Sequence, residues 1–457
     1  MNQLTAKLAI RKTPLGAKAS ALIGIILVAL SMLFVGVHVS QHTKVSPVDE
    51  FVYIDYLAKI PEQGVVRQGE LSGPFARNYL DCHGLAVFEW DVADRCALKD
   101  TADSNDYPNH GYTSADIYTP AYFAVTWVLA QPIQWITGTD LVFAGRLVGG
   151  LWLGGAAVFL FAALRRARVS TVLAVAAPVM MIGSLPTWWA NTFISTDATA
   201  LLAGSALLYL AMRFLDDGKR GWMLALTSVL AVMLKMQNYL GVVAAGLVIV
   251  ISLFVGWLNT RGVGGNRFWV FIRSEKRFRS VVLMLVLPLV AQIVWMLARA
   301  ALSLGSSPDQ EVSQALDKAA LVREFLNFFD HPTTGATETS TFGTAGILIA
   351  SISGWLIVAA TIGLTVVRRK ADWSLGSSVS LAYLIATFVG GPALAIATTA
   401  MVGYYFPLPP RYALSVLPFA LFAVSLLFDV NRVWRWIIGI MAGGFFVASL
   451  VMQVSWS

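Results

Sequence analysis

The chain has 457 residues, of which 57% are hydrophobic and only 13% are charged, and its net charge is +7. A soluble protein would carry roughly 25% charged residues, so the composition excludes an ordinary soluble domain. The basic balance does not indicate nucleic-acid binding. Most Lys and Arg residues lie in short segments between apolar runs, where basic residues set the topology of a membrane protein.

Apolar runs of about 20 residues recur along the chain, and each is long enough to cross a bilayer as a helix. The sequence therefore predicts an all-α polytopic membrane protein with about 11 transmembrane helices. The expected spans are 20–39, 143–164, 170–188, 197–214, 221–235, 239–257, 281–302, 345–367, 377–400, 411–429 and 434–454.

The basic clusters fix an expected orientation. Placing the clusters at 165–168, 213–220, 261–279, 368–370 and 432–435 in the cytoplasm gives one consistent threading. Residues 1–19 then form a cytoplasmic N-terminus, and 20–457 form a single transmembrane domain whose C-terminus lies outside. We expect an integral protein of the bacterial plasma membrane whose active site is on the outer face.

Two long outer loops are expected, at 40–119 and 303–344, and long loops on one face are where chemistry is usually housed. The stretch 120–138 is apolar enough to cross the membrane. If it did, however, the cluster at 165–168 would lie outside. We therefore interpret it as a helix in the outer interface, where Trp and Tyr are favoured.

The only two cysteines, Cys82 and Cys96, both fall in the first outer loop. The outside of the membrane is the oxidising side, which favours a disulfide between them, the alternative being two free thiols. The scattered histidines show no zinc-site spacing.

The stretch 46–53 (Ser-Pro-Val-Asp-Glu-Phe-Val-Tyr) places two carboxylates, Asp49 and Glu50, just beyond the first span. A sugar hydroxyl is a weak nucleophile, so transfer of a sugar onto it requires a carboxylate base within hydrogen-bond reach. The alternative is that both acids cap the helix that follows, because acids are favoured at a helix N-terminus.

Further ionisable residues are expected at the outer membrane surface. Asp116 precedes the interfacial helix, Asp197 lies at the outer end of a span, and Lys235 lies at the outer end of the following one. Such groups are expensive at membrane depth and often functional, although Asp116 could be a helix cap and the other two could simply reach the interface. Lys235 also departs from the rule that basic residues stay inside.

Arg411 follows a proline-rich segment, 407–410, and starts a late span. The arginine fork matches phosphate oxygens in pairs, which suits a lipid-linked sugar phosphate. The alternative is that Arg411 and Tyr412 anchor the span in the interface.

Taken in chain order, these motifs resemble those of the GT-C superfamily of integral-membrane glycosyltransferases. The resemblance is to the protein O-mannosyltransferase and aminoarabinose-transferase type. An outer Asp-Glu follows the first span, and 118–122 (Tyr-Thr-Pro-Ala-Tyr) stands where these enzymes carry His-Pro-Pro-Leu-Tyr. Residues 196–200 match a Pro-Asp-Ala-Leu-Leu stretch, 234–237 match Thr-Lys-Gly-Pro loosely, and 411–418 match Arg-Tyr-x-Leu-x-x-x-Pro.

The resemblance implies a GT-C-like fold with outer interfacial helices. It also implies inverting transfer of a sugar from a polyprenyl-phosphate donor to a glycan, lipid or protein acceptor. By the same match, Asp49 is the leading base and Glu50 the second, while Lys235, Arg411 and Tyr412 hold the donor phosphate. The remaining substrate-site candidates are Asp116, Tyr118, Tyr122 and Asp197.

The family's histidine and first proline are missing here. No large soluble C-terminal domain is expected either, so we expect the acceptor to be recognised by the two outer loops. Some members use a divalent metal such as Mg²⁺ or Mn²⁺. Asp49 and Asp116 could share such an ion, but no spacing demands it.

Two other classes compete with this interpretation. A transporter or flippase of a lipid-linked or small polar substrate would show repeated halves with broken helices. No internal repeat is evident, although Gly390-Gly391-Pro392 interrupts one span. A non-catalytic assembly protein would make Asp49, Lys235 and Arg411 individually dispensable.

Overall fold

The computed structural model describes residues 16–86, 92, 95–96, 103–260, 277–306, 314–335, 343–367 and 375–452. Within these residues the fold is all-helical, and the few backbone bridges are isolated. The first half contains α1 (Ala17–Gln41), α2 (Glu50–Gln63), α3 (Pro74–His83), η1 (Ser104–Asp106), η2 (Pro108–Gly111), η3 (Ala115–Ile117), α5 (Ala121–Thr137), α6 (Leu141–Arg166), α7 (Thr171–Ile182), α8 (Leu185–Asn191), η4 (Thr196–Thr199), α9 (Ala200–Asp217) and α10 (Gly221–Leu234). The second half contains η5 (Met236–Asn238), α11 (Tyr239–Thr260), α13 (Phe278–Leu302), α14 (Lys318–Asn327), α15 (His331–Thr334), α16 (Gly343–Ile362), η7 (Gly363–Val367), α17 (Leu375–Phe388), α18 (Gly390–Val402), η8 (Pro410–Val416), α19 (Leu417–Phe428) and α20 (Arg432–Val451).

Eight of the described helices are long and apolar enough to cross a membrane, and the number rises to ten if each of two bent pairs counts as one span. The bent pairs are α7 with α8, at 59°, and α17 with α18, at 40°. Each of the eleven expected spans coincides with one of these helices, with a bent pair, or with the shorter apolar α10. The composition and the helices thus agree on a polytopic membrane protein, while the number of spans that cross stays a prediction.

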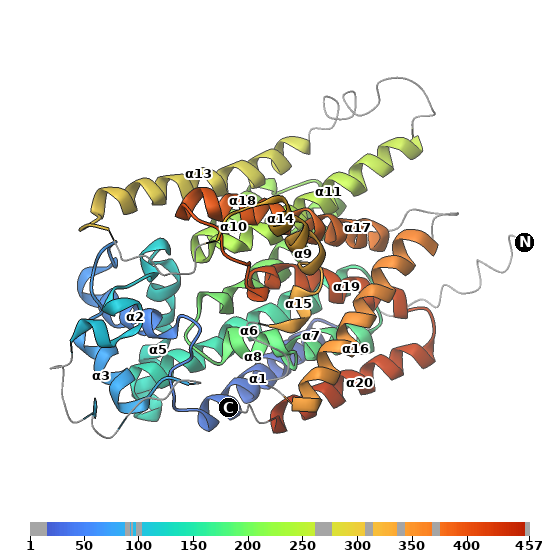
Figure 1. The fold of residues 1–457 in the computed structure, drawn as a ribbon. Coiled ribbons are helices and arrows are strands. Elements are labelled where there is room, and N and C mark those ends of the chain that lie inside the picture. Colours follow the sequence, from blue (N-terminus) through green and yellow to red (C-terminus); the bar gives the residue numbers. More distant parts are fainter. Residues whose placement is uncertain are drawn as a thin grey trace, which may run out of the picture.

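The two ends of the bundle differ. Helices α2, α3 and α5 gather at one end (Figure 1, left). At the opposite end, ion pairs join the basic helix ends: Arg166 contacts Asp216, and Arg435 contacts Asp429. Helix α6 has 26 residues, so it spans about 39 Å between these two ends. This separation of basic ends from α2, α3 and α5 is the arrangement that the basic clusters predict.

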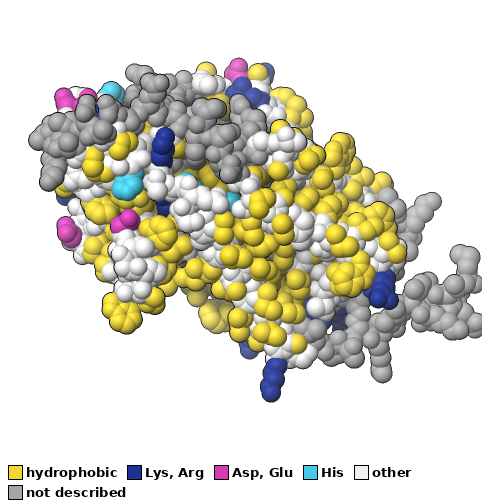
Figure 2. Space-filling model, turned by 90° about the horizontal axis from the view of Figure 1, so that it is seen from below, with side chains coloured by type: hydrophobic (Ala, Val, Ile, Leu, Met, Phe, Trp, Pro, Cys, Tyr) yellow, Lys and Arg dark blue, Asp and Glu magenta, His cyan; other side chains and the backbone are white. Residues whose placement is uncertain are grey.

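Helix α5 occupies the stretch expected to lie in the interface. It packs against α2 and α6 and leaves Trp135 86% exposed. Figure 2 shows hydrophobic side chains spread over the broad middle of one face of the molecule, with charged side chains mostly towards its edges. Helix α13 runs along the edge of the bundle (Figure 1, top) and exposes a row of Leu, Val and Ile side chains. Such a surface suits contact with lipid.

Two glycines allow the backbones to approach where the site is built. A Cβ on Gly204 of α9 would lie 2.0 Å from the carbonyl oxygen of Ser415, and one on Gly149 of α6 would lie 1.9 Å from that of Asn191. No other residue fits such contacts without moving a backbone. Gly204 therefore lets η8 press onto α9, which brings the start of η8 to the end of the bundle where α2 begins.

Candidate functional site

Four charged side chains from four segments form one chain of alternating charge. Arg411, at the start of η8, donates from Nη2 to Oδ2 of Asp49 at 2.7 Å. Its Nε lies 3.3 Å from Oδ2 of Asp197 in η4. The other oxygen of Asp197 pairs with the ammonium of Lys235, which stands between α10 and η5. The structure therefore brings together the predicted base and both predicted phosphate-binding cations.

Local structure positions the side chains of Asp197 and Lys235. Ser195 caps η4 by accepting from the backbone N–H of Asp197 at 3.2 Å, and its hydroxyl donates to Oδ2 of the same residue at 3.0 Å. Lys235 has an extended backbone that interrupts the helical path between α10 and η5. Both side chains are at least 97% buried, so their charges are compensated mainly by each other and by Arg411.

Asp49 is held in an unusual backbone conformation, with φ of +61°, which non-glycine residues adopt rarely. Its side chain makes no capping hydrogen bond to α2, although the residue occupies the N-cap position. With 40% of its surface exposed, the carboxylate instead faces Arg411 and the cavity beside it. The local geometry thus favours a role other than helix capping.

Glu50 has different surroundings from its neighbour. It is fully buried, and Arg146 of α6 donates to both of its oxygens at 2.8 Å. The backbone N–H groups of Ser46 and Ile194 donate to it as well. Four donors satisfy this carboxylate away from the cavity, so the geometry favours a positioning role for Glu50 over its expected role as a second base.

Tyrosines surround the charges. The ring of Tyr412 lies 5.3 Å from Nζ of Lys235 and 5.6 Å from Cζ of Arg411, within the range of cation–π attraction. The hydroxyl of Tyr53 donates to that of Tyr118 at 3.2 Å, and burial raises the pKa of both phenols well above its usual value. Tyr122 accepts from the N–H of Ser195 and is buried outside the cavity.

The charged chain borders a cavity of about 860 Å³, which we call the main cavity. This size lies within the roughly 300–1,000 Å³ typical of ligand sites. Asp49, Tyr118, Arg411 and Tyr412 form part of its wall. The rest includes polar side chains such as Gln68 and Gln314, aromatic ones such as Tyr404 and Phe406, and the methionines Met296 and Met401.

A second acid–base pair lines the same cavity. Arg299, near the end of α13, contacts Oδ2 of Asp116 at 2.6 Å. Burial raises the pKa of the Asp116 carboxyl, and the guanidinium opposes that rise. We did not single out Arg299 from the sequence, yet it carries the same signal as Lys235, a basic residue at the expected outer end of a span.

The segment 116–119 links this wall to three helices. Asp116 contacts Arg299, and the carbonyl of Ile117 accepts from Nε1 of Trp295 at 3.0 Å, which ties the segment to α13. Tyr118 contacts α2 through Tyr53, and the hydroxyl of Thr119 donates to the carbonyl of Met233 in α10. Consecutive residues thus hold α2, α10 and α13 together at the end of the bundle where α2 begins.

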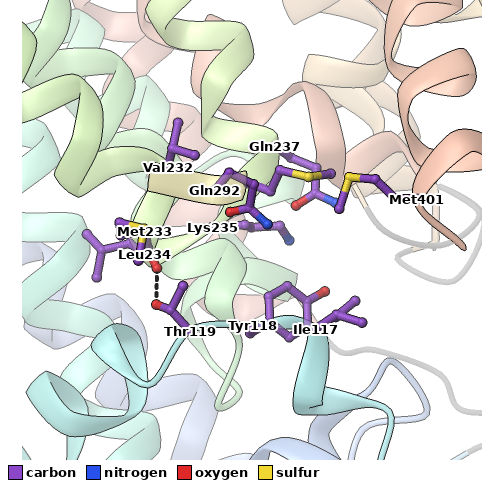
Figure 3. A pocket seen from close by; sticks show the side chains of 11 residues that line it. Ile117, Tyr118, Thr119, Val232, Met233, Leu234, Lys235, Gln237, Gln292 and Met401 are labelled. Atoms are coloured by element: carbon purple, nitrogen blue, oxygen red, sulfur yellow. Dashed lines mark hydrogen bonds between the residues drawn. The ribbon is translucent and has the colours of Figure 1, made fainter. Parts of the chain in front are cut away.

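A smaller space of about 30 Å³, which we call the side chamber, lies next to the main cavity and shares part of its wall. Figure 3 shows the Lys235, Gln237 and Gln292 side chains converging on it, with Thr119 bonded to Met233 along one edge. Gln292 comes from the middle of α13, whose surrounding residues are apolar.

The disulfide expected from the sequence is confirmed, because Cys82 and Cys96 are bonded. Next to it, Asp81 accepts from Arg95 at 2.9 Å and from the hydroxyl of Tyr107 at 2.6 Å. Asp49 and Asp116, the two carboxylates that could share a divalent metal, each pair with an arginine through Oδ2. Among the described residues, no group of three or more His, Cys, Asp or Glu side chains is arranged to hold a metal ion.

No protein-family model, curated protein or solved structure matches the chain.

Proposed function

We propose that the chain is a membrane glycosyltransferase that moves a sugar from a polyprenyl-phosphate donor onto a hydroxyl of an envelope acceptor, with inversion at the sugar carbon. The observation that carries the proposal is the pairing of Asp49 with Arg411 on the wall of the main cavity, with Asp197 and Lys235 directly behind them. A carboxylate base beside two cations and a phenol is the set of groups that this reaction needs.

In the proposed reaction, the acceptor oxygen attacks the anomeric carbon from the face opposite the phosphate. The new carbon–oxygen bond forms as the bond from that carbon to the phosphate oxygen breaks, and the polyprenyl phosphate leaves. The acceptor proton passes to Asp49, whose carboxylate is the exposed one of the two acids at the start of α2. Acceptors remain a glycan, a lipid or a protein.

Arg411 and Lys235 both have N–H groups that remain available to donate to the phosphate. Arg411 has five N–H groups, and its contacts with Asp49 and Asp197 use only part of that fork. The ammonium of Lys235 has three donors and contacts one carboxylate. Charge that develops on the leaving phosphate would thus meet preorganised donors, which is the usual source of electrostatic stabilisation in a transition state.

A transporter or flippase is the second candidate. The bent pairs α7–α8 and α17–α18 favour it, because broken spans often surround the substrate sites of transporters. In that case the same charged chain would bind a substrate that crosses the membrane unchanged.

Transfer of radiolabelled sugar from polyprenyl-phosphate donors in membranes tests the proposal. Asp49→Asn is expected to lower transfer about 10²-fold or more while the protein stays folded, because that is the scale of removing a general base. Asp103→Asn is the matched control, since Asp103 is an exposed acid of the same outer loop. Equal activity of wild type and Asp49→Asn would remove Asp49 as the base. Movement of intact labelled substrate across proteoliposomes, without transfer, would favour the transporter.

A further inference from the structure

The wall of the side chamber includes two neutral amide side chains that do not belong to the chain of four charged residues. Gln237 is 5% exposed and Gln292 is 8% exposed. Oε1 of Gln237 has no hydrogen-bond partner in the described part of the chain. An unmet amide oxygen in a buried site costs free energy, so a group that is absent from the protein itself would be a natural partner.

Gln292 strengthens this argument because of its position. It lies midway along α13, whose face towards the outside exposes Leu289, Val290 and Ile293. An amide side chain midway along an apolar helix is costly to bury unless it finds hydrogen-bond partners. Figure 3 shows the side chain of Gln292 next to those of Gln237 and Lys235 in the wall of the chamber.

The size of the chamber limits what it can hold. A water needs about 10–15 Å³ by this measure, so about 30 Å³ holds two or three oxygen-sized groups: it has room for some oxygens of a phosphate whose remainder lies in the main cavity, but not for a sugar ring. Apolar residues complete the wall, among them Val232, Leu234 and Met401. The main cavity next to it has the room for a sugar and an acceptor.

From these observations we infer that the phosphate of a polyprenyl-phosphate ligand binds where the side chamber borders the main cavity, with Gln237 and Gln292 as neutral hydrogen-bonding residues beside Lys235 and with Arg411 on the side of the main cavity. Each amide nitrogen can donate to a phosphate oxygen, and the free oxygen of Gln237 can accept from a hydroxyl of the attached sugar. The charges of Lys235, Arg411, Asp49 and Asp197 sum to zero, so a bound phosphate would depend on hydrogen bonds from these amides as well as on the two cations. The inference rests on the proposed function and names the residues that hold its donor.

The test is binding without transfer. Affinities of the purified protein for undecaprenyl phosphate and for undecaprenol would be measured in the same detergent. Wild type is expected to prefer the phosphate. Gln237→Leu and Gln292→Leu are each expected to weaken phosphate binding about tenfold and to leave binding of the alcohol unchanged, as for loss of one hydrogen bond to a charged group. Gln134→Leu, in α5 and away from the chamber, is the matched control.

Stability measurements separate a binding role from a structural one. Gln292→Leu replaces an amide by an apolar group of similar size, so its melting temperature should equal or exceed that of wild type. Unchanged phosphate affinity in both variants, or equal losses for phosphate and alcohol, would overturn the inference while the proposed function stands. A wild type with no preference for the phosphate would overturn both.

Discussion

Arg411 donates to Asp49 at 2.7 Å, although 362 positions separate the two residues in the sequence. The contact places the proposed base at the start of α2 and the proposed phosphate ligand at the start of η8 on one wall of one cavity. A guanidinium that binds the donor phosphate would at the same time orient the carboxylate that receives the acceptor proton.

Replacing Arg411 by lysine tests this shared role. Lysine keeps the charge but not the fork that reaches Asp49 and Asp197 together, so we expect transfer to fall by about 10–100-fold, mainly in kcat. Steady-state kinetics with varied donor would check it. Arg435→Lys, at the opposite end of the bundle, is the control. A lysine variant with wild-type kcat would show that the fork is not needed.

The pair of Glu50 and Arg146 predicts a large effect on stability. Both side chains are at least 98% buried, so Glu50→Gln leaves a buried guanidinium without its counter-charge. Breaking such a pair costs about 3–5 kcal/mol. Thermal unfolding in detergent should show a clear drop for Glu50→Gln and for Arg146→Met. The double variant Glu50→Gln with Arg146→Met should lose less stability than the sum of the two single losses, and additive losses would contradict this account.

The disulfide should stabilise the first outer loop. Cys82 and Cys96 are 14 positions apart, and closing a loop of that length contributes about 3 kcal/mol in the chain-entropy model. Cys82→Ser with Cys96→Ser should therefore lower the melting temperature, and a reductant should do the same to wild type. The double serine variant should not respond to reductant. A reductant effect that persists in this variant would come from elsewhere.

The Asp116 carboxyl predicts a dependence of stability on pH. Burial raises its pKa above the ordinary value of 3.8, so the protonated form is favoured by folding. Its contribution is complete below that value and is lost as the pH rises through the raised pKa. The melting temperature of Asp116→Asn, relative to wild type, should therefore increase over this range. Melting curves across pH would check it, and a relative decrease would mean that the Arg299 pair outweighs the cost of burial.

Much of the helical framework could be predicted from the sequence, because hydropathy reports the length and position of apolar segments directly. The expected spans coincide with helices, and the interruption expected at Gly390-Gly391-Pro392 is the bend between α17 and α18. The bend between α7 and α8 was not predicted, although Gly183 and Ser184 followed by Pro186 in the first turn of α8 mark it in the sequence.

The candidate site was predicted in part. Asp49, Asp197, Lys235 and Arg411 were singled out as residues, and their contact in one chain follows from the fold. The different surroundings of Glu50 and the partnership of Arg299 with Asp116 depend on distant segments. Adjacent carboxylates look equivalent in a sequence, and only packing separates them.

The ion pairs of the site and its support share an order along the chain. Glu50 precedes Arg146, Asp116 precedes Arg299, and Asp197 precedes Lys235, as Asp49 precedes Arg411. In the expected topology, the acidic residue of each pair is therefore synthesised, and reaches the outer side of the membrane, before the basic residue that pairs with it. A membrane potential that is negative inside assists outward passage of an anion and opposes that of a cation, by about 2.3 kcal/mol per charge for 100 mV. Each basic residue would thus reach the outer side when its acidic partner is already there. The attraction between the two charges would offset the opposing membrane potential, so the order of synthesis would favour correct insertion.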